Sequence, residues 1–263
     1  MVVRTIFVTR HGFRGTWDLD LESGSYTSKF LSPTKIPVDP PLVAYGVQQS
    51  HQLADALIST VPRISRIYSS PYYRCLETIR PAAEKLELKI NADNGIGEWF
   101  GQAPFPHPGP ATPSLLNTLF PSLETNYIPS CYPPATGESL PQLYARIAFA
   151  LSYVIADADS ASGGAEIALV ICTHAAPLII IGRVLTGNLP TNVGEQDFKA
   201  FTTGLSRFER RQIPTRYITK SGLHVQDETP NIDWTGGKGV SGGWDCVANC
   251  DCTPLKGGEE RGW

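Results

Sequence analysis

The chain has 263 residues, with 22 Lys and Arg against 25 Asp and Glu, and its formal net charge is −3. This balance lacks the basic footprint of a nucleic-acid-binding protein, so we expect no direct contact with nucleic acid. No apolar run approaches the length of a membrane-spanning helix, and the apolar start is too short for a signal peptide, so we expect no membrane association. The six cysteines are therefore expected to be reduced thiols.

Hydrophobic periodicity divides the chain into alternating strands and helices. In chain order it predicts a strand at 2–9, a polar loop at 17–41, a helix at 42–60, a strand at 64–68, a helix at 71–86, a strand at 88–90, helices at 114–120 and 143–155, a strand at 167–173, a helix at 175–185 and antiparallel strands within 204–225. Ser70 and Pro71 are expected to cap and open the second helix. The order predicts an α/β fold with a mostly parallel central sheet, helices on both faces and a few antiparallel edge strands.

Two of the predicted strands end in histidine, at His11 and at His174. In open α/β sheets, ligands bind beyond the carboxyl ends of the strands. Parallel packing brings those ends to one edge of the sheet, so we expect both histidines to face the same ligand.

The segment Arg10-His11-Gly12-Phe13-Arg14 joins a histidine to two arginines. A neutral imidazole is a nucleophile, and neighbouring guanidinium groups disfavour its protonated form while they neutralise a phosphate dianion. Gly12 lets the backbone come close to a substrate. Taken alone, the same segment also fits a strand-end turn with incidental charges.

Two further residues could complete a phosphate pocket. Arg74 lies near the start of a predicted helix, where backbone N–H groups favour anions, and its guanidinium could fork onto two phosphate oxygens. His174 could donate a hydrogen bond to another phosphate oxygen. A solvated arginine and a satisfied core histidine are the alternatives.

Glu98 lies within Gly97-Glu98-Trp99-Phe100, beside two aromatic residues. Transfer of a phosphoryl group to histidine leaves an alkoxide that needs a proton, and a carboxyl with a raised pKa could supply it. Trp99 and Phe100 would raise the pKa of Glu98 and the arginines would lower it, and the sequence does not decide between them. A loop carboxylate that caps a backbone amide is the alternative.

The order and spacing of these residues carry more information than any one of them. Arg-His-Gly after the first strand, Ser-Pro-x-x-Arg-x-x-x-Thr about sixty residues later, a lone Glu, and Thr-His after a late strand together resemble the histidine phosphatase superfamily, also called phosphoglycerate-mutase-like. The resemblance spans roughly residues 2–185. It implies that His11 is the phosphorylated nucleophile, that Glu98 is the general acid, and that no metal or other cofactor takes part. The phosphate pocket that it implies comprises Arg10, Arg14, Arg74 and His174.

Two positions depart from the superfamily pattern. Ala175 follows the second histidine where most members have Gly, and alanine still offers its backbone N–H. Phe13 stands where many members have Glu, at a rim position that bears on substrate choice more than on chemistry.

Several segments resemble one subgroup, the histidine-phosphatase subunits of the fungal RNA polymerase III factor TFIIIC, also called tau. They are the run 2–14 with Trp17, the segments 72–78 and 95–99, and the late segment 244–247. This resemblance implies other TFIIIC subunits as partners and a location in the nucleus. Animal tyrosine-phosphatase-like proteins of the suppressor-of-T-cell-signalling type share much of the pattern, so a cytoplasmic phosphatase outside TFIIIC is the alternative.

The stretch between Lys89 and Arg146 contains no Lys or Arg. The resemblance places a capping insertion here, at about 99–135, where mutases and polyphosphate phosphatases need cations for extra anionic groups. This cap offers aromatic residues instead: Trp99, Phe100, Phe105, Phe120, Tyr127 and Tyr132. They fit an apolar or aromatic, phosphotyrosine-like leaving group and disfavour mutase or phytase activity, although they could also only pack the cap.

Two functions remain open after the mutase is set aside. The first is a metal-independent phosphoric monoester hydrolase, and the second is an interaction subunit that retains a phosphate pocket without physiological catalysis. Because all six expected pocket residues are present, retained activity is favoured.

The domain organisation follows from the same patterns. We expect a histidine-phosphatase-like domain at 1–230 and a Gly- and Cys-rich tail at 231–263 that docks a partner. The spacing of the late cysteines is poor for a tetrahedral zinc site, so we expect no metal there. The residues considered are Cys246, Cys250, Cys252 and His224.

Overall fold

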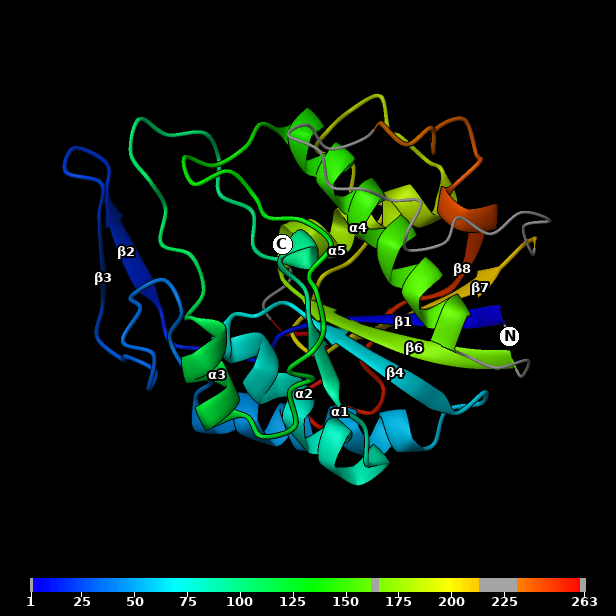
Figure 1. Ribbon diagram of the computed structural model, residues 1–263, viewed down its shortest axis with the longest axis horizontal. Helices are drawn as coiled ribbons and strands as arrows, with labels where there is room; N and C mark the ends of the chain where they lie inside the picture. Colours follow the sequence, from blue (N-terminus) through cyan, green and yellow to red (C-terminus); the bar gives the residue numbers. More distant parts are fainter. Residues whose placement is uncertain (1, 162–165, 213–230, 261–263) are drawn as a thin grey trace.

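A six-stranded sheet forms the centre of the protein in the computed structural model, which describes residues 2–161, 166–212 and 231–260 (Figure 1). The strand order is β5-β4-β6-β1-β7-β8. The parallel strands are β1 (Val2–Arg10), β4 (Ile64–Ser69), β5 (Ile90–Ala92) and β6 (Glu166–Thr173). The antiparallel strands are β7 (Leu205–Arg210) and β8 (Trp244–Asp251). The predicted α/β fold with a mostly parallel sheet is confirmed.

Helices cover both faces of this sheet (Figure 1). On one face lie α1 (Ala44–Ile58) and α2 (Tyr73–Leu86), and on the other lie α4 (Leu140–Ala161) and α5 (Ala175–Thr186). Successive side chains of β1 point to opposite faces, so Phe7 packs in the α1–α2 cluster while Ile6 and Val8 pack in the α4–α5 cluster. Among the described residues, no helix combines the length and apolarity needed to cross a membrane.

The pairing of β1 with β6 determines where the candidate site lies. Their parallel register places Arg10 opposite Thr173, and the N–H of His11 donates to the Thr173 carbonyl at 2.9 Å. The two strands therefore end together, and the rings of His11 and His174 lie 5.4 Å apart between centroids. Parallel packing thus brings both histidines to one edge, as the sequence predicted.

The segment 17–41 is less irregular than predicted. Its first part forms an antiparallel hairpin of β2 (Trp17–Asp20) and β3 (Ser25–Ser28). The Asp20 carboxylate accepts hydrogen bonds from the backbone N–H groups of Glu22 and Ser23, and these bonds stabilise the turn of the hairpin. The polar composition of the segment did not distinguish such a turn from an irregular loop. The hairpin lies beside the cap, which also contains α3 (Pro113–Leu119) (Figure 1).

The second helix begins later than predicted, and a distant residue caps it. α2 starts at Tyr73, so Ser70 is not its N-cap. The carboxylate of Asp39 instead accepts hydrogen bonds from the N–H groups of Tyr73 at 2.5 Å and Arg74 at 3.3 Å. Because the capping group lies more than thirty residues away along the chain, local sequence signals could not identify it.

The last segment departs from the expected tail. β8 pairs with β7 as an edge strand of the central sheet, and Trp244 is fully buried with Arg210 over its ring. Residues 244–251 therefore complete the sheet, although the glycines around them had suggested an irregular tail. The further strands expected after residue 212, and His224, fall in 213–230, outside the described residues.

Candidate active site

His11 lies at the carboxyl end of β1 and is 2% exposed. Its Nδ1 lies 2.9 Å from the Gly12 carbonyl oxygen, which can only accept, so Nδ1 carries the proton and Nε2 keeps a free lone pair. Burial lowers the pKa of His11 well below its ordinary value, and the charges of Arg74 and Arg10 lower it further. The imidazole is therefore neutral and nucleophilic at neutral pH.

The backbone after His11 is held against α1 and α2. The N–H of Gly12 donates to Thr78 Oγ1 at 2.9 Å, and the N–H of Phe13 donates to Gln49 Oε1 at 2.9 Å. A Cβ at Gly12 would lie 2.9 Å from the carbonyl oxygen of Gly46 in α1. The glycine is therefore required for close packing of this turn on α1, a reason different from the substrate approach that the sequence suggested.

Arg10 and Arg14 lie half-buried on either side of His11. Arg10 Nη1 donates to the Ala200 carbonyl at 2.7 Å, and Arg14 Nη1 donates to the Gly15 carbonyl at 2.7 Å. The Arg14 guanidinium also lies over the ring of Trp17, 5.9 Å from its centroid. In these two contacts both guanidinium groups donate to neutral carbonyl oxygens.

Arg74 is the most deeply buried cation of the site, at 1% exposure. Its Nη1 donates to the Val38 carbonyl at 2.9 Å and to Asp39 Oδ1 at 3.0 Å, and its Nη2 donates to Glu98 Oε2 at 2.9 Å. Its Nε is buried and has no hydrogen-bond acceptor among the described residues. Burial lowers the pKa of Arg74, but the charges of Asp39 and Glu98 outweigh that effect and raise it.

His174 closes the other side of the site as the N-cap residue of α5. Its Nε2 lies 2.8 Å from Ser70 Oγ, and its Nδ1 lies 3.0 Å from Arg74 Nη2 and 3.2 Å from Glu98 Oε2. A neutral ring accepts from Arg74 through Nδ1, whereas a protonated ring donates to Glu98. In the neutral ring the single N–H is on Nε2, which faces Ser70 Oγ.

Glu98 is ionised in this arrangement. Burial raises its pKa, but the charge and hydrogen bond of His174 and the charge of Arg74 outweigh that effect and hold the pKa of Glu98 well below its ordinary value. Its Oε1 also accepts from the N–H of Trp99 at 3.0 Å, as in the amide-capping alternative. The competition that the sequence left open is therefore decided by the cations, not by the aromatic neighbours.

Arg146 holds the loop that carries Glu98. Its Nη1 donates to the carbonyl groups of Gly95 at 2.9 Å and Gly97 at 3.1 Å, and its Nε donates to the Glu138 carboxylate at 2.9 Å. Arg146 and Glu138 are both almost fully buried. The pair thus fixes the backbone on which the Glu98 side chain depends.

The structure brings all six predicted site residues to one edge of the sheet, and it adds others that the sequence analysis did not assign. Asp39 fixes Arg74, Ser70 contacts His174, and Arg146 supports the Glu98 loop. Ser70 was expected only as a helix cap. Asp39 and Arg146 carry no local signal, because their roles depend on partners distant in sequence.

The cap places some of its aromatic side chains beside the site. Phe100 stacks on His107 with ring centroids 4.8 Å apart, and Tyr72 lies 6.4 Å from Phe100. A cavity of about 220 Å³ lies among these three rings and borders Glu98. Two other aromatic residues of the cap only pack it: Phe120 is buried against Tyr73, and the Tyr127 hydroxyl donates to Asp93.

No cluster of three or more His, Cys, Asp or Glu side chains that could hold a metal ion occurs within residues 2–161, 166–212 and 231–260. The arrangement around His11 instead offers one nucleophilic nitrogen, three guanidinium groups and one carboxylate. This set suits a tetrahedral dianion and its transfer to nitrogen.

Orthovanadate or inorganic phosphate should bind against His11 and the three arginines. The variant Arg14→Met removes one cation of the site, so we expect vanadate affinity to fall roughly 10- to 10²-fold, the value of one charge-assisted contact. Isothermal titration measures the change. Arg80→Met, at an exposed α2 position paired with Glu84, is the matched control. Equal affinity for wild type and Arg14→Met would show that the anion does not use this pocket.

Comparisons with known proteins agree with this geometry. The chain is 30% identical to the transcription factor tau 55 kDa subunit of Saccharomyces cerevisiae over 275 residues, which cover 100% of this chain and 59% of that protein. It is 29% identical to the ecdysteroid-phosphate phosphatase of Drosophila melanogaster over 73% of this chain and 28% of that protein. The chain thus spans about three fifths of the first relative and less of the second.

Solved structures share the fold. The ecdysone phosphate phosphatase of Bombix mori in complex with tungstate has a TM-score of 0.61 at 20% identity, covering 88% of this chain and 98% of that chain. A phosphoglycerate mutase of Bacillus anthracis has a TM-score of 0.52 at 15% identity, covering 95% and 94%. Residues 24–213 match the histidine phosphatase superfamily (branch 1). The chain belongs to the histidine phosphatase superfamily.

Proposed function

We propose that this protein hydrolyses a phosphomonoester through a phosphohistidine intermediate on His11. The main support for the proposal is the neutral His11 imidazole, whose Nε2 has a free lone pair. The charges of Arg10, Arg14 and Arg74 surround this ring. These cations neutralise the phosphoryl oxygens and so permit a nucleophile to approach. The chemistry needs no metal ion, because the arginines supply the positive charge.

The reaction proceeds in two transfers. In the first, His11 Nε2 forms a bond to phosphorus, the bond from phosphorus to the leaving oxygen breaks, and that oxygen keeps the electron pair and takes a proton from Glu98. In the second, water attacks the phosphohistidine and loses a proton to the Glu98 carboxylate, and the bond from phosphorus to His11 Nε2 breaks to restore neutral His11. Glu98 then passes that proton to the departing phosphate, which leaves as the monoanion and restores the ionised carboxylate. Atoms and charges balance with water as the only co-reactant.

Glu98 must gain a proton before it can act as an acid. In the free site its carboxylate is stabilised by Arg74 and His174, so it is ionised. A bound phosphate group competes for those same two partners and adds negative charge beside the carboxylate, and both effects raise the pKa of Glu98. The substrate monoanion therefore brings the proton that Glu98 passes to the leaving oxygen.

The leaving group is proposed to be apolar or aromatic, in the manner of phosphotyrosine. The cap contains no Lys or Arg that could hold a second anionic group, and the cavity beside Glu98 is bordered by Tyr72, Phe100 and His107. A mutase or a polyphosphate phosphatase would need cations at this position. Apolar rings instead favour a leaving group without charge.

We also propose that the protein acts as a TFIIIC subunit in the nucleus. Its similarity to the tau 55 kDa subunit over the full length of this chain supports that assignment. The alternative roles are an interaction subunit whose pocket is not used for catalysis and a cytoplasmic phosphatase outside TFIIIC. The resemblance of the site residues to a complete phosphatase set favours catalysis.

Substitution of Glu98 separates proton transfer from nucleophilic attack. Glu98→Gln should slow the hydrolysis of alkyl phosphates by roughly 10²-fold or more, because their alkoxide leaving groups need protonation. The hydrolysis of activated aryl phosphates should be slowed clearly less. His11→Ala should abolish both reactions, since the nucleophile serves every substrate. Steady-state kinetics in buffer with EDTA give both comparisons. Equal slowing of the two ester classes by Glu98→Gln would remove Glu98 from the role of acid.

The pH dependence of kcat/KM follows from two pKa directions. Because the pKa of His11 is lowered, the nucleophile stays neutral and activity should not fall as pH decreases through 6.5. Because the pKa of Glu98 is lowered, the proton must come with the substrate, whose second pKa is about 6. We expect kcat/KM for an alkyl phosphate to fall about tenfold per pH unit above that value. An activity that rises from pH 6 to pH 8 would contradict this mechanism.

The TFIIIC assignment predicts association with proteins and not with DNA. The tagged protein should co-purify with other TFIIIC subunits, and the isolated chain should bind DNA weakly because its formal net charge is −3. Affinity purification followed by mass spectrometry tests the first expectation, and electrophoretic mobility shift tests the second. Tight, salt-sensitive DNA binding by the isolated chain would argue against it.

A further inference from the structure

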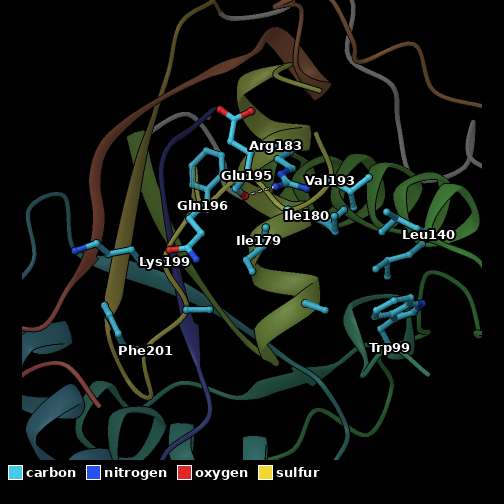
Figure 2. Close-up of a pocket in the computed structure, with 15 residues that line it drawn as sticks. Trp99, Leu140, Ile179, Ile180, Arg183, Val193, Glu195, Gln196, Lys199 and Phe201 are labelled. Carbon is cyan, nitrogen blue, oxygen red and sulfur yellow. Dashed lines mark hydrogen bonds between the residues drawn. The ribbon is translucent and has the colours of Figure 1, made fainter. Parts of the chain in front are cut away.

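A second cavity of about 420 Å³ lies along α5 (Figure 2). Its walls come from the start of α4, one face of α5, Trp99 and the segment 193–201 that covers them. The α5 face contributes Ala176, Ile179 and Ile180, which follow the helical repeat. We refer to this space as the α5 cavity. Its volume is in the range of pockets that hold small organic ligands.

Three residues that line the α5 cavity lie next to residues of the phosphate pocket, one by direct contact and two by their position in the chain. Trp99 directly follows Glu98, Ala176 lies two residues after His174, and the carbonyl of Ala200 accepts from Arg10 at 2.7 Å. Figure 2 shows Trp99 and Phe201 on either side of the lower end of α5, with Arg183 and Glu195 toward the upper end. The cavity therefore begins beside the catalytic residues and extends along the helix.

The two cations that line the α5 cavity, Arg183 and Lys199, are both paired. Arg183 donates to Asp197 at 2.8 Å, to the Tyr144 hydroxyl at 2.8 Å and to the Glu195 carbonyl at 2.9 Å. Lys199 forms an ion pair with Glu259 at 3.0 Å. A second anionic group of a ligand would have to displace these partners, whereas an apolar group finds Trp99 and aliphatic side chains. The lining thus selects an uncharged, apolar ligand.

We propose that the α5 cavity binds the bulky hydrocarbon body of the alcohol that is esterified to phosphate. The inference rests on the proposed function, since it gives the substrate of His11 a class: the phosphomonoester of a bulky, uncharged, apolar small-molecule alcohol. The phosphate lies among the arginines, the ester oxygen lies near Glu98, and the body passes Trp99 into the α5 cavity. Most of the surface of such an alcohol is apolar and would contact Trp99, Ile179 and Ile180, which lose no hydrogen bond when it binds.

Two esters with alcohols of similar pKa isolate the effect of the cavity. We compare kcat/KM for ethyl phosphate and for the phosphate of 2-(1-adamantyl)ethanol, whose rigid cage carries no charge. For the wild type we expect a preference for the adamantyl ester of roughly 10²-fold, as burial of several apolar carbon atoms gives. Ile179→Trp fills the cavity and should reduce this ratio to below about threefold. Val193→Trp obstructs its exposed rim without touching the core, and should also reduce the ratio.

Ile58→Trp is the matched control. Ile58 is 44% exposed at the end of α1, and α1 covers the face of the sheet opposite to α5. It should keep the full preference. Binding of free 2-(1-adamantyl)ethanol, measured by calorimetry on wild type and the three variants, gives a readout without catalysis. Alcohol binding that Ile179→Trp and Val193→Trp weaken, with no hydrolysis of either ester, would support the cavity and refute the phosphatase. Hydrolysis of both esters with equal kcat/KM would overturn the inference and leave the phosphatase standing.

Discussion

A guanidinium group buried at the carboxyl edge of the sheet is the constraint on which the site depends. The terminal nitrogens of Arg74 bind Val38, Asp39, Glu98 and His174, which come from three separate parts of the chain. A buried charge is tolerated only when it is paired, and removal of one partner from such a pair typically costs about 3–5 kcal/mol. Arg74 therefore requires the loop before α1, the start of α2, the Glu98 loop and the start of α5 to meet in one arrangement. The same desolvated charge makes that edge attractive to an anion.

The parallel sheet supplies the second condition, which is a nucleophile in the correct protonation state. The end of β1 pairs with the end of β6, so His11 is buried beside His174 and cannot be solvated as a cation. Burial and the surrounding arginines act in the same direction on His11, whereas on Glu98 burial and the cations oppose each other and the cations win. The same arginines thus keep His11 neutral and Glu98 ionised, which are the protonation states from which the proposed mechanism starts.

Chemistry and selectivity are separated in space. The phosphate pocket contains the charged groups, while two cavities with apolar linings border it, one beside Phe100 in the cap and one along α5. Neither cavity offers a cation without an acidic partner among the described residues, because Arg183 and Lys199 are both in ion pairs. On the proposed function, the phosphate pocket contacts the group that every phosphomonoester shares, so selection among alcohols is assigned to the apolar walls. The family's chemistry and this chain's specificity therefore depend on different residues.

The sequence by itself determined the features that depend on residues close together in the chain. Alternation of strands and helices predicted the parallel sheet, and the strand-end motifs predicted that His11 and His174 meet. Tertiary structure decided what depends on distant partners: Asp39 caps α2 in place of Ser70, and a Gly- and Cys-rich segment forms strand β8 instead of a tail. Hydrophobic periodicity and turn chemistry act over a few residues and can be read along the chain. Burial, charge pairing and cavity shape arise only when separate segments pack, so the ionised state of Glu98 and the α5 cavity could come only from the fold.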